Sequence, residues 1–151
     1  MFITAAMEKT NGPYDMPGDR TATRKRRLMI VDDDLDVLPL YEIAGESEDT
    51  LLTIQTGALS ALKHLDALGY QVDAVILDLS MPDMDGITLT RQIRRNEEIR
   101  GTDKPIKIFW FTGYPINDTI NAAGRQYKIT EIFQKPESPV DIVNRVKQYL
   151  H

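Results

Sequence analysis

Short apolar runs alternate with stretches of helical periodicity along most of the chain. The runs are rich in Val, Ile, Leu and Phe, as is typical of strands that a parallel sheet buries on both faces. The predicted strands cover residues 28–31, 50–55, 74–77, 106–111 and 131–134. The predicted helices cover residues 35–45, 57–69, 87–99, 116–123 and 138–150. This alternation predicts an α/β domain in which five helices cover both faces of a doubly wound, five-stranded parallel sheet.

The helical stretches also predict where helices begin and end and which side chains face the core. Pro39 fits only the first turn of its helix, Gly69 favours a helix end, and Ser138 before Pro139 favours a helix start. The charges of the third helix are expected on its outer face. The predicted inward faces are Leu35, Leu38, Tyr41 and Ile43; Leu59, Leu62, Leu65 and Leu68; Ile87, Leu89 and Ile93; and Val140, Val143, Val146 and Leu150.

The beginning of the chain differs in composition from the rest. Residues 1–23 are rich in Thr, Gly, Pro and Asp and lack periodicity, which predicts a disordered tail. We therefore expect a tail over residues 1–26 and one domain over residues 27–151. The basic run Arg24–Arg27 is either a patch for an acidic partner or nucleic acid, or a solvated cluster beside a strand. So short a run favours the solvated cluster.

The bulk composition excludes several classes of protein. The chain has 151 residues, a formal net charge of −5 and no cysteine. This charge argues against a polyanion-binding molecule, and the lack of cysteine excludes disulfides, thiol catalysis and thiolate metal sites. No apolar run approaches the ~20 residues that span a bilayer, and the N-terminus lacks the basic segment of a signal peptide. We therefore expect a cytoplasmic protein with no membrane partner and no nucleic-acid partner.

Charged and hydroxyl side chains follow the predicted strands. Ligands of doubly wound sheets bind beyond the carboxyl ends of the strands, where the strand order reverses. The residues at these ends are Asp32, Asp33 and Asp34 after the first strand, Asp78 after the third, Thr112 after the fourth and Lys135 after the fifth. Clustered carboxylates repel one another, and a hard cation such as Mg2+ relieves that repulsion. Beside such a cation an aspartate is a candidate nucleophile toward phosphorus, while an ammonium and a hydroxyl hold phosphoryl oxygens.

Each of these residues also has a purely structural explanation. The run of aspartates is suited to capping the next helix, and Asp78 is suited to a turn. Thr112 is of a type that strands favour, and Lys135 is of a type usually found on surfaces. No single position decides between the two interpretations. Their joint occurrence at successive strand ends favours a shared site.

Four segments resemble the signature segments of the receiver domain of two-component response regulators: LMIVDDD, VILDLSMPDMDG, FWFTG and FQKP. They occur in the order of that family and at nearly its usual spacing, and the resemblance covers about residues 27–150. It implies a flavodoxin-like three-layer sandwich and a role in phosphorelay signalling. It also implies a histidine kinase or histidine phosphotransfer protein as phosphoryl donor, and a downstream protein as target.

The resemblance gives a role to each residue at the strand ends. It implies that Asp78 is the phosphoacceptor and that Thr112 and Lys135 bind the phosphoryl group. Asp34, the third acid of its run, is expected to cap the first helix. The implied ligands of Mg2+ are Asp32, Asp33, Asp78 and the backbone carbonyl of Ser80.

Further positions concern the lifetime and the transmission of the signal. Ser80 and Tyr114 occupy the positions that tune the phosphoryl lifetime in the family, and the bulk of Tyr114 predicts slow autodephosphorylation by excluding water. The family usually carries Tyr or Phe three residues before the lysine, a ring that moves inward with the threonine, whereas this chain has Ile132. Phe133 follows, but the period of two in strands points it to the opposite face. The other candidate reporters are Trp110, Tyr114 and Tyr127.

We expect a single-domain response regulator, because the chain ends with the last predicted helix. Such a protein catalyses only its own phosphorylation and dephosphorylation, so we do not expect an enzyme. An aspartyl-phosphate hydrolase needs a second acid two residues after the nucleophile, where this chain has Ser80. The other alternative is a receiver-like adaptor that works without phosphorylation, and the complete set of Asp, Thr and Lys residues argues against it.

Overall fold

One parallel sheet of five strands forms the centre of the computed structural model, which describes residues 24–150. Of the predicted tail over residues 1–26, residues 1–23 lie outside the described residues, whereas Arg26 belongs to the first strand of the sheet. The strands are β1 (Arg26–Val31), β2 (Thr50–Gln55), β3 (Ala74–Asp78), β4 (Lys107–Thr112) and β5 (Glu131–Gln134). Their order is β2-β1-β3-β4-β5, and every pairing is parallel. The predicted flavodoxin-like α/β fold is confirmed.

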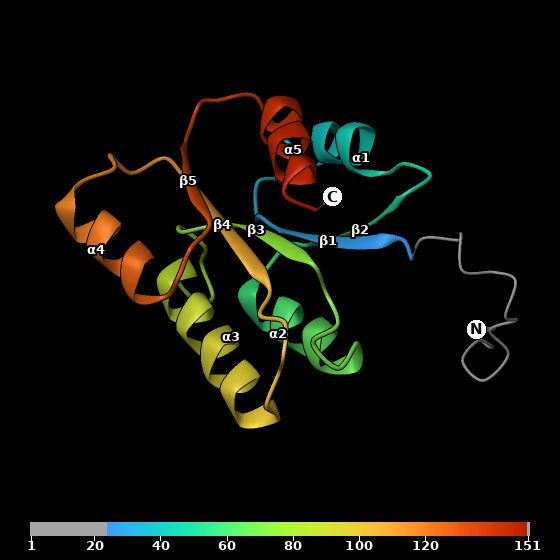
Figure 1. Cartoon of the computed structure of the whole chain (residues 1–151). Helices are drawn as coiled ribbons and strands as arrows, with labels where there is room; N and C mark the ends of the chain where they lie inside the picture. Colours follow the sequence, from blue (N-terminus) through green and yellow to red (C-terminus); the bar gives the residue numbers. More distant parts are fainter. Residues whose placement is uncertain (1–23, 151) are drawn as a thin grey trace, which may run out of the picture.

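Helices cover both faces of the sheet (Figure 1). They are α1 (Leu38–Gly45), α2 (Ala58–Ala67), α3 (Gly86–Arg100), α4 (Asp118–Gln126) and α5 (Pro139–Gln148). Helices α1 and α5 lie on one face, and α2, α3 and α4 lie on the other. Among the residues described, no helix combines the length and the apolar character that crossing a membrane requires.

The helix ends follow local chemistry, as predicted. Pro39 lies in the first turn of α1, where its missing amide hydrogen leaves no helical hydrogen bond unmade. Ser138 caps α5 by accepting a hydrogen bond from the amide of Asp141 at 3.5 Å. Gly69, just beyond α2, has φ 60°, a left-handed conformation that glycine adopts without strain.

The sheet separates two apolar cores. Phe109 and Phe133 face α1 and α5, and their stacked rings have centroids 6.1 Å apart. Trp110 faces α2 and α3 and is fully buried, and its indole N–H donates a hydrogen bond to Thr90 Oγ1 at 2.9 Å. Every residue of β3 is buried. Burial on both faces explains why β3 is apolar without interruption up to Asp78.

Three leucine and isoleucine side chains predicted to face the core are exposed instead. They are Leu35, Ile43 and Leu59, with exposed fractions of 67%, 76% and 56%. Leu35 precedes the start of α1, and Tyr41 is the large side chain that α1 buries. Helix α2 buries Ala58 and Ala61 beside Leu65, so its inward face is rotated away from Leu59.

The expectation that α3 keeps its charges outside is wrong for Arg94 and Glu97. Glu97 is buried and accepts hydrogen bonds from Arg94 at 2.8 Å and from the amide of Ile106 at 2.6 Å. Arg94 also donates to the carbonyls of Ile106, Tyr127 and Lys128. This hydrogen-bonded pair ties α3 to the start of β4 and to the turn before β5.

The basic run enters the sheet, because β1 begins at Arg26. Asp73, directly before β3, accepts hydrogen bonds from the guanidinium of Arg24 at 2.8 Å and from the amide of Arg27 at 2.7 Å. The guanidinium of Arg26 lies 3.9 Å from the same carboxylate. These contacts give the basic run a structural role at the amino ends of β1 and β3.

Candidate functional site

Four strands bring polar residues together at the carboxyl edge of the sheet. Asp32 and Asp33 follow β1, Lys135 follows β5, and Asp78 and Thr112 are the last residues of β3 and β4. Strand β1 lies between β2 and β3, so the strand order reverses beside it. Ligands of such sheets bind at this reversal. The structure therefore places the predicted site residues where a ligand is expected.

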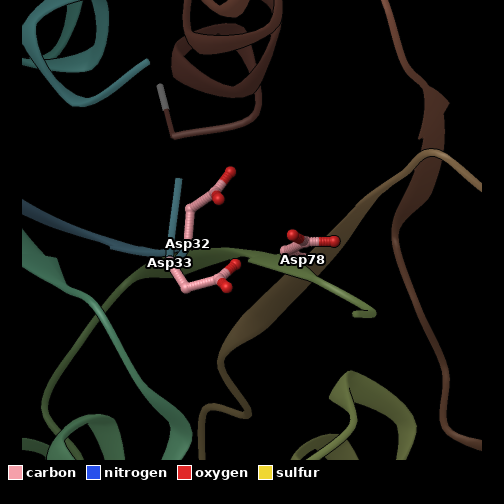
Figure 2. Close-up of side chains that lie close together, drawn as sticks. All are labelled: Asp32, Asp33 and Asp78. Carbon is pink, nitrogen blue, oxygen red and sulfur yellow. The ribbon is translucent and has the colours of Figure 1, made fainter. Parts of the chain in front are cut away.

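Three carboxylates form a compact group at this edge (Figure 2). One oxygen from each of Asp32, Asp33 and Asp78 lies within 4.8 Å of the other two. Asp32 and Asp78 are buried, whereas Asp33 is exposed to solvent. Oxygen donors gathered in this way, with one side open to water, suit a hard divalent cation. These residues fit the predicted Mg2+ site, and the role of the Ser80 carbonyl as a further ligand stays a prediction.

Lys135 supplies positive charge to the carboxylate group. Its Nζ lies 3.3 Å from Asp78 Oδ2 and 3.5 Å from Asp32 Oδ2. Burial raises the pKa of Asp32 above its usual value, while the hydrogen bond from the Asp34 amide and the charge of Lys135 act in the opposite direction. One ammonium thus faces several carboxylates, and the excess of negative charge favours a further cation.

The loop after Asp78 folds closely around that residue. Asp78 Oδ1 accepts a hydrogen bond from the amide of Ser80 at 3.0 Å. The amide of Gly86 donates to the carbonyl of Leu79 at 2.9 Å and closes the loop. A Cβ on Gly86 would lie 2.6 Å from Leu79 Cα and would overlap the carbonyl oxygen of Asp78. Only glycine allows this approach of the start of α3 to the end of β3.

The other two acids of this loop, Asp83 and Asp85, cap helices. Asp85 caps α3 by accepting a hydrogen bond from an amide of its first turn. Asp83 reaches a different helix, and accepts hydrogen bonds from the amides of Ala58 at 3.2 Å and Leu59 at 3.0 Å. Helix α2 has Gly57 before its first residue and no side-chain cap of its own. Asp83 therefore joins the loop after Asp78 to the start of α2.

Tyr114 links the loop after β4 to the loop after β3. Its amide donates a hydrogen bond to Thr112 Oγ1 at 2.9 Å, and its hydroxyl forms a hydrogen bond of 3.3 Å with Ser80 Oγ. Thr112 is fully buried, whereas Tyr114 is 52% exposed. The two side chains predicted to tune the phosphoryl lifetime are thus in contact with each other beside Asp78.

The side chains of β5 alternate as the period of two predicts. Phe133 is buried in the core that faces α1 and α5, whereas Ile132 packs against the core on the other face. Ile132 is paired with Trp110 of β4. A Cβ on Gly124 of α4 would lie only 3.1 Å from Ile132 Cδ1. The side chain at the predicted switch position is therefore packed closely beneath α4.

The prediction that Asp34 caps the first helix is wrong. Its Oδ1 accepts a hydrogen bond from the amide of Asp36 at 3.0 Å, so the side chain stabilises a turn before α1. The residue that precedes α1 is Val37, which has no side-chain oxygen to offer. Asp34 also stands outside the compact carboxylate group.

One residue at this edge did not emerge from the sequence as a candidate. Gln134, the last residue of β5, donates hydrogen bonds from Nε2 to the carbonyls of Thr112 and Tyr114, each at 2.9 Å. Its Oε1 accepts a hydrogen bond from the amide of Ile116 at 3.2 Å. The one signal in the sequence is its position directly before Lys135, because a long polar side chain at a strand end can reach a neighbouring loop.

Comparison with known proteins gives a consistent result. The family model of the response regulator receiver domain matches residues 28–147. The DNA-binding response regulator MtrA of Mycobacterium tuberculosis is 30% identical over 132 residues, which cover 85% of this chain and 52% of that protein. The chain spans about half the length of the curated relatives it matches.

Solved structures share the fold. A putative response regulator from Chloroflexus aurantiacus is 26% identical with a TM-score of 0.66, and the match covers 84% of this chain and 98% of that one. A chain of the CheX-CheY-BeF3-Mg+2 complex from Borrelia burgdorferi is 19% identical with a TM-score of 0.68, and the match covers 85% and 91%. The family match extends over all the strand ends described above. The chain belongs to the family of response regulator receiver domains.

Proposed function

We propose that this protein is a cytoplasmic response regulator that accepts a phosphoryl group on Asp78 in a Mg2+-dependent reaction. The donor is the phosphohistidine of a histidine kinase or of a histidine phosphotransfer protein. The result is a changed binding surface for a downstream protein. One observation carries the proposal: the carboxylates of Asp32, Asp33 and Asp78 converge beside Lys135 at the edge of the sheet where ligands bind.

The carboxylate group supports the proposed metal dependence. Asp32, Asp33, Asp78 and the backbone carbonyl of Ser80 would hold Mg2+, which supplies neutralising charge for the phosphoryl oxygens. The chain itself orients two of these ligands. The amide of Asp34 donates a hydrogen bond to Asp32 Oδ1 at 3.0 Å, and the amide of Ser80 donates one to Asp78 Oδ1 at 3.0 Å. Ligands held in this way need little rearrangement when the ion binds.

The arrangement suits direct transfer to Asp78. In the proposed step a carboxylate oxygen of Asp78 bonds to phosphorus, while the bond from phosphorus to the donor imidazole nitrogen breaks and its electron pair remains on that nitrogen. Lys135 Nζ, which lies 3.3 Å from Asp78 Oδ2, binds one oxygen of the transferred group. The hydroxyl of Thr112, at the end of the neighbouring strand β4, binds another. Attack of water on phosphorus later restores the carboxylate and releases phosphate.

The similar proteins support a signalling role. The Borrelia burgdorferi structure combines CheY with BeF3 and Mg2+, which fits a receiver that binds a phosphoryl-like group together with this ion. MtrA is described as DNA-binding, but this chain matches only about half of that protein. We therefore propose protein partners for this chain and carry over no DNA binding.

The site favours a phosphoacceptor over a hydrolase that turns over small substrates. The hydrolase alternative needs an acid two residues after the nucleophile, and Ser80 stands there. Asp83 and Asp85 cannot substitute for it, because both are hydrogen-bonded to helix N-termini. We propose that the chain catalyses only its own phosphorylation and dephosphorylation.

The proposal is tested by transfer of labelled phosphate. The full chain is incubated with Mg2+ and a phosphorylated histidine kinase, or with a small phosphodonor such as acetyl phosphate. We expect labelling of the wild type, no labelling of Asp78→Asn, and no labelling of the wild type when EDTA removes the metal. Asp85→Asn is a matched control, because asparagine is also a good capping residue and position 85 lies outside the carboxylate group.

Two results would contradict the proposal. Equal labelling of the wild type and Asp78→Asn would place the phosphoryl group elsewhere. No response to any donor, together with no change in Trp110 fluorescence on addition of beryllofluoride and Mg2+, would instead support an adaptor that works without phosphorylation.

A further inference from the structure

The side chain of Gln134 bridges the end of β5 and the β4–α4 loop, residues 113–117. Its Nε2 donates to the carbonyl of Thr112, the last residue of β4, and to the carbonyl of Tyr114 within the loop, each at 2.9 Å. Its Oε1 accepts from the amide of Ile116 at 3.2 Å. One side chain therefore makes three hydrogen bonds to the backbone of Thr112 and the loop that follows it.

The partners fix the orientation of this carboxamide. Two of them are carbonyls, which accept only from the NH2 group, and the third is an amide N–H, which donates only to the oxygen. The opposite orientation would set the Gln134 oxygen against two carbonyl oxygens. The side chain thus recognises one conformation of the loop, and a shift at Tyr114 or Ile116 breaks part of this set.

Gln134 is also a direct neighbour of both residues proposed to hold the phosphoryl group, because it is paired with Thr112 across the sheet. It directly precedes Lys135, and the amide of Lys135 donates to the Thr112 carbonyl at 2.7 Å, the same oxygen that Gln134 binds. The hydroxyl oxygen of Thr112 accepts a hydrogen bond from the amide of Tyr114 at 2.9 Å. A movement of Thr112 toward a phosphoryl group on Asp78 therefore acts directly on the loop segment that Gln134 holds.

Resting on the proposed function, we propose that Gln134 is a positioning residue that holds the β4–α4 loop in its unphosphorylated conformation, so that phosphorylation of Asp78 releases the loop by drawing Thr112 away from these hydrogen bonds. The loop carries two exposed apolar side chains, Tyr114 and Ile116. Their rearrangement is the change that a partner protein detects.

The packing at position 132 explains why hydrogen bonds from β5, and not a moving aromatic ring, hold the β4–α4 loop. Ile132 has no aromatic ring that could change its orientation, and its side chain is in close contact with α4 at Gly124. Trp110, the neighbour of Ile132 on β4, is fully buried, and the indole N–H of Trp110 donates a hydrogen bond to Thr90 Oγ1. The β5 side chain that contacts the β4–α4 loop through hydrogen bonds is Gln134, on the same face of the strand as Ile132.

Loss of a contact that favours one of two states shifts the population toward the other. Removal of the Gln134 carboxamide should therefore raise the fraction of free protein in the phosphorylation-competent conformation. Affinity for a phosphoryl analogue should rise by the same factor. Only the hydrogen bonds that differ between the two conformations shift the population, so we expect a gain of at least about fivefold, the factor that the loss of one of the three at ordinary net strength represents. A residue that only stabilises the fold gives no such gain.

The test titrates beryllofluoride with Mg2+ into Gln134→Ala and Gln134→Met. The methionine keeps the length of the side chain and removes its hydrogen bonds, which provides a second variant should alanine impair folding. Gln92→Ala, at an exposed position of α3, is the matched control. The measurements are the apparent affinity, the amide NMR shifts of Tyr114 and Ile116 in the free protein, and the labelling of Asp78.

The expected result is tighter binding in both variants at position 134, with free-state shifts displaced toward those of the beryllofluoride-bound wild type. Unchanged or weaker binding, in a variant that is still labelled on Asp78, overturns the role of Gln134. Failure of the proposed function is distinguishable, because it appears in the wild type as absent labelling, or as equal labelling of Asp78→Asn.

Discussion

Tyr114 is connected to Asp78 through Ser80. The Tyr114 hydroxyl forms a hydrogen bond of 3.3 Å with Ser80 Oγ, while the amide of Ser80 donates a hydrogen bond to the Asp78 carboxylate. The ring therefore spans from the β4–α4 loop to the loop that follows Asp78, the proposed phosphoacceptor. We propose that a bulky ring in this place restricts the access of water to an acyl phosphate on Asp78.

The lifetime of the phosphoryl group should accordingly depend on Tyr114. We expect Tyr114→Ala to lose labelled phosphate several-fold faster than the wild type, because water gains access to the phosphorus atom. Tyr114→Phe keeps the ring and removes only the contact with Ser80, so its half-life should remain closer to that of the wild type. A wild-type half-life of only seconds, or equal rates in all three proteins, would count against shielding.

Residue types at the strand ends made the site predictable. Asp32, Asp33, Asp78, Thr112 and Lys135 each follow or end an apolar run, and parallel strands carry such positions to one edge. The partners of Gln134 and Asp83 were not predictable in this way. Each of these side chains forms hydrogen bonds with the backbone of a segment that is distant in the sequence, and the periodicity of apolar residues carries no information on such pairs.

At the scale of elements, the loop after β3 depends on a helix that precedes it in sequence. Asp83 accepts hydrogen bonds from two amides at the N-terminus of α2, where Gly57 offers no cap. A carboxylate is also favourable there because of the partial positive charge of the helix end. These hydrogen bonds lower the pKa of Asp83 below its usual value.

Removal of this cap should destabilise the fold. We expect Asp83→Ala to lower the free energy of unfolding by about 1 kcal/mol, the usual value of a helix N-cap, as measured by denaturant unfolding. Asp83→Asn keeps an acceptor oxygen and should lose less. An alanine variant as stable as the wild type would show that the two amides are equally well satisfied by water.

Asp73 joins the amino ends of neighbouring strands. Burial alone would raise the pKa of Asp73, but the hydrogen bonds from the Arg24 guanidinium and the Arg27 amide outweigh it and lower the pKa below its usual value. Its backbone carbonyl also accepts from the amide of Lys107 in β4. The carboxylate form of Asp73 is therefore the one that the folded state stabilises.

The contribution of Asp73 should depend on pH in a defined direction. Because the pKa is lower in the folded than in the unfolded state, the stabilisation is present above the unfolded value of ~3.9 and is lost as the pH falls through the folded value. We expect Asp73→Asn to be less stable than the wild type at pH 7, with the difference shrinking below about pH 4. A difference that grew in acid, in denaturant unfolding across this pH range, would contradict this assignment.

The helix faces show the limit of periodicity. Leu59 fits an apolar pattern and yet is exposed, because small residues such as Ala58 and Ala61 allow α2 to approach the sheet on a different side. Ile43 is likewise exposed, because α1 buries Tyr41 and Gly45 instead. Arg94 and Glu97 read as outer charges and yet are paired beneath the surface. Which side chains of a helix are buried depends on the volume and polarity of the elements that face it, and the sequence of that helix alone does not contain this information.

At the scale of the whole molecule, the sequence pattern restricts the possible strand orders more strongly than it restricts any single side-chain contact. Apolar runs separated by helical segments leave few arrangements of a parallel sheet with right-handed crossovers, and the observed order β2-β1-β3-β4-β5 is one of them. That order sets Asp32 and Asp78 on adjacent strands, with Thr112 and Lys135 on the next two. The fold itself thus assembles the proposed site from segments spread across the chain.

The location of the phosphoryl group is the most direct test of the central claim. The full chain is phosphorylated with Mg2+, the acyl phosphate is reduced with borohydride, and the modified residue is identified by peptide mass spectrometry. We predict conversion of Asp78 to homoserine, and no conversion in the presence of EDTA. Modification of Asp32 or Asp33 in place of Asp78, or a phosphoryl group that borohydride does not reduce, would contradict the account.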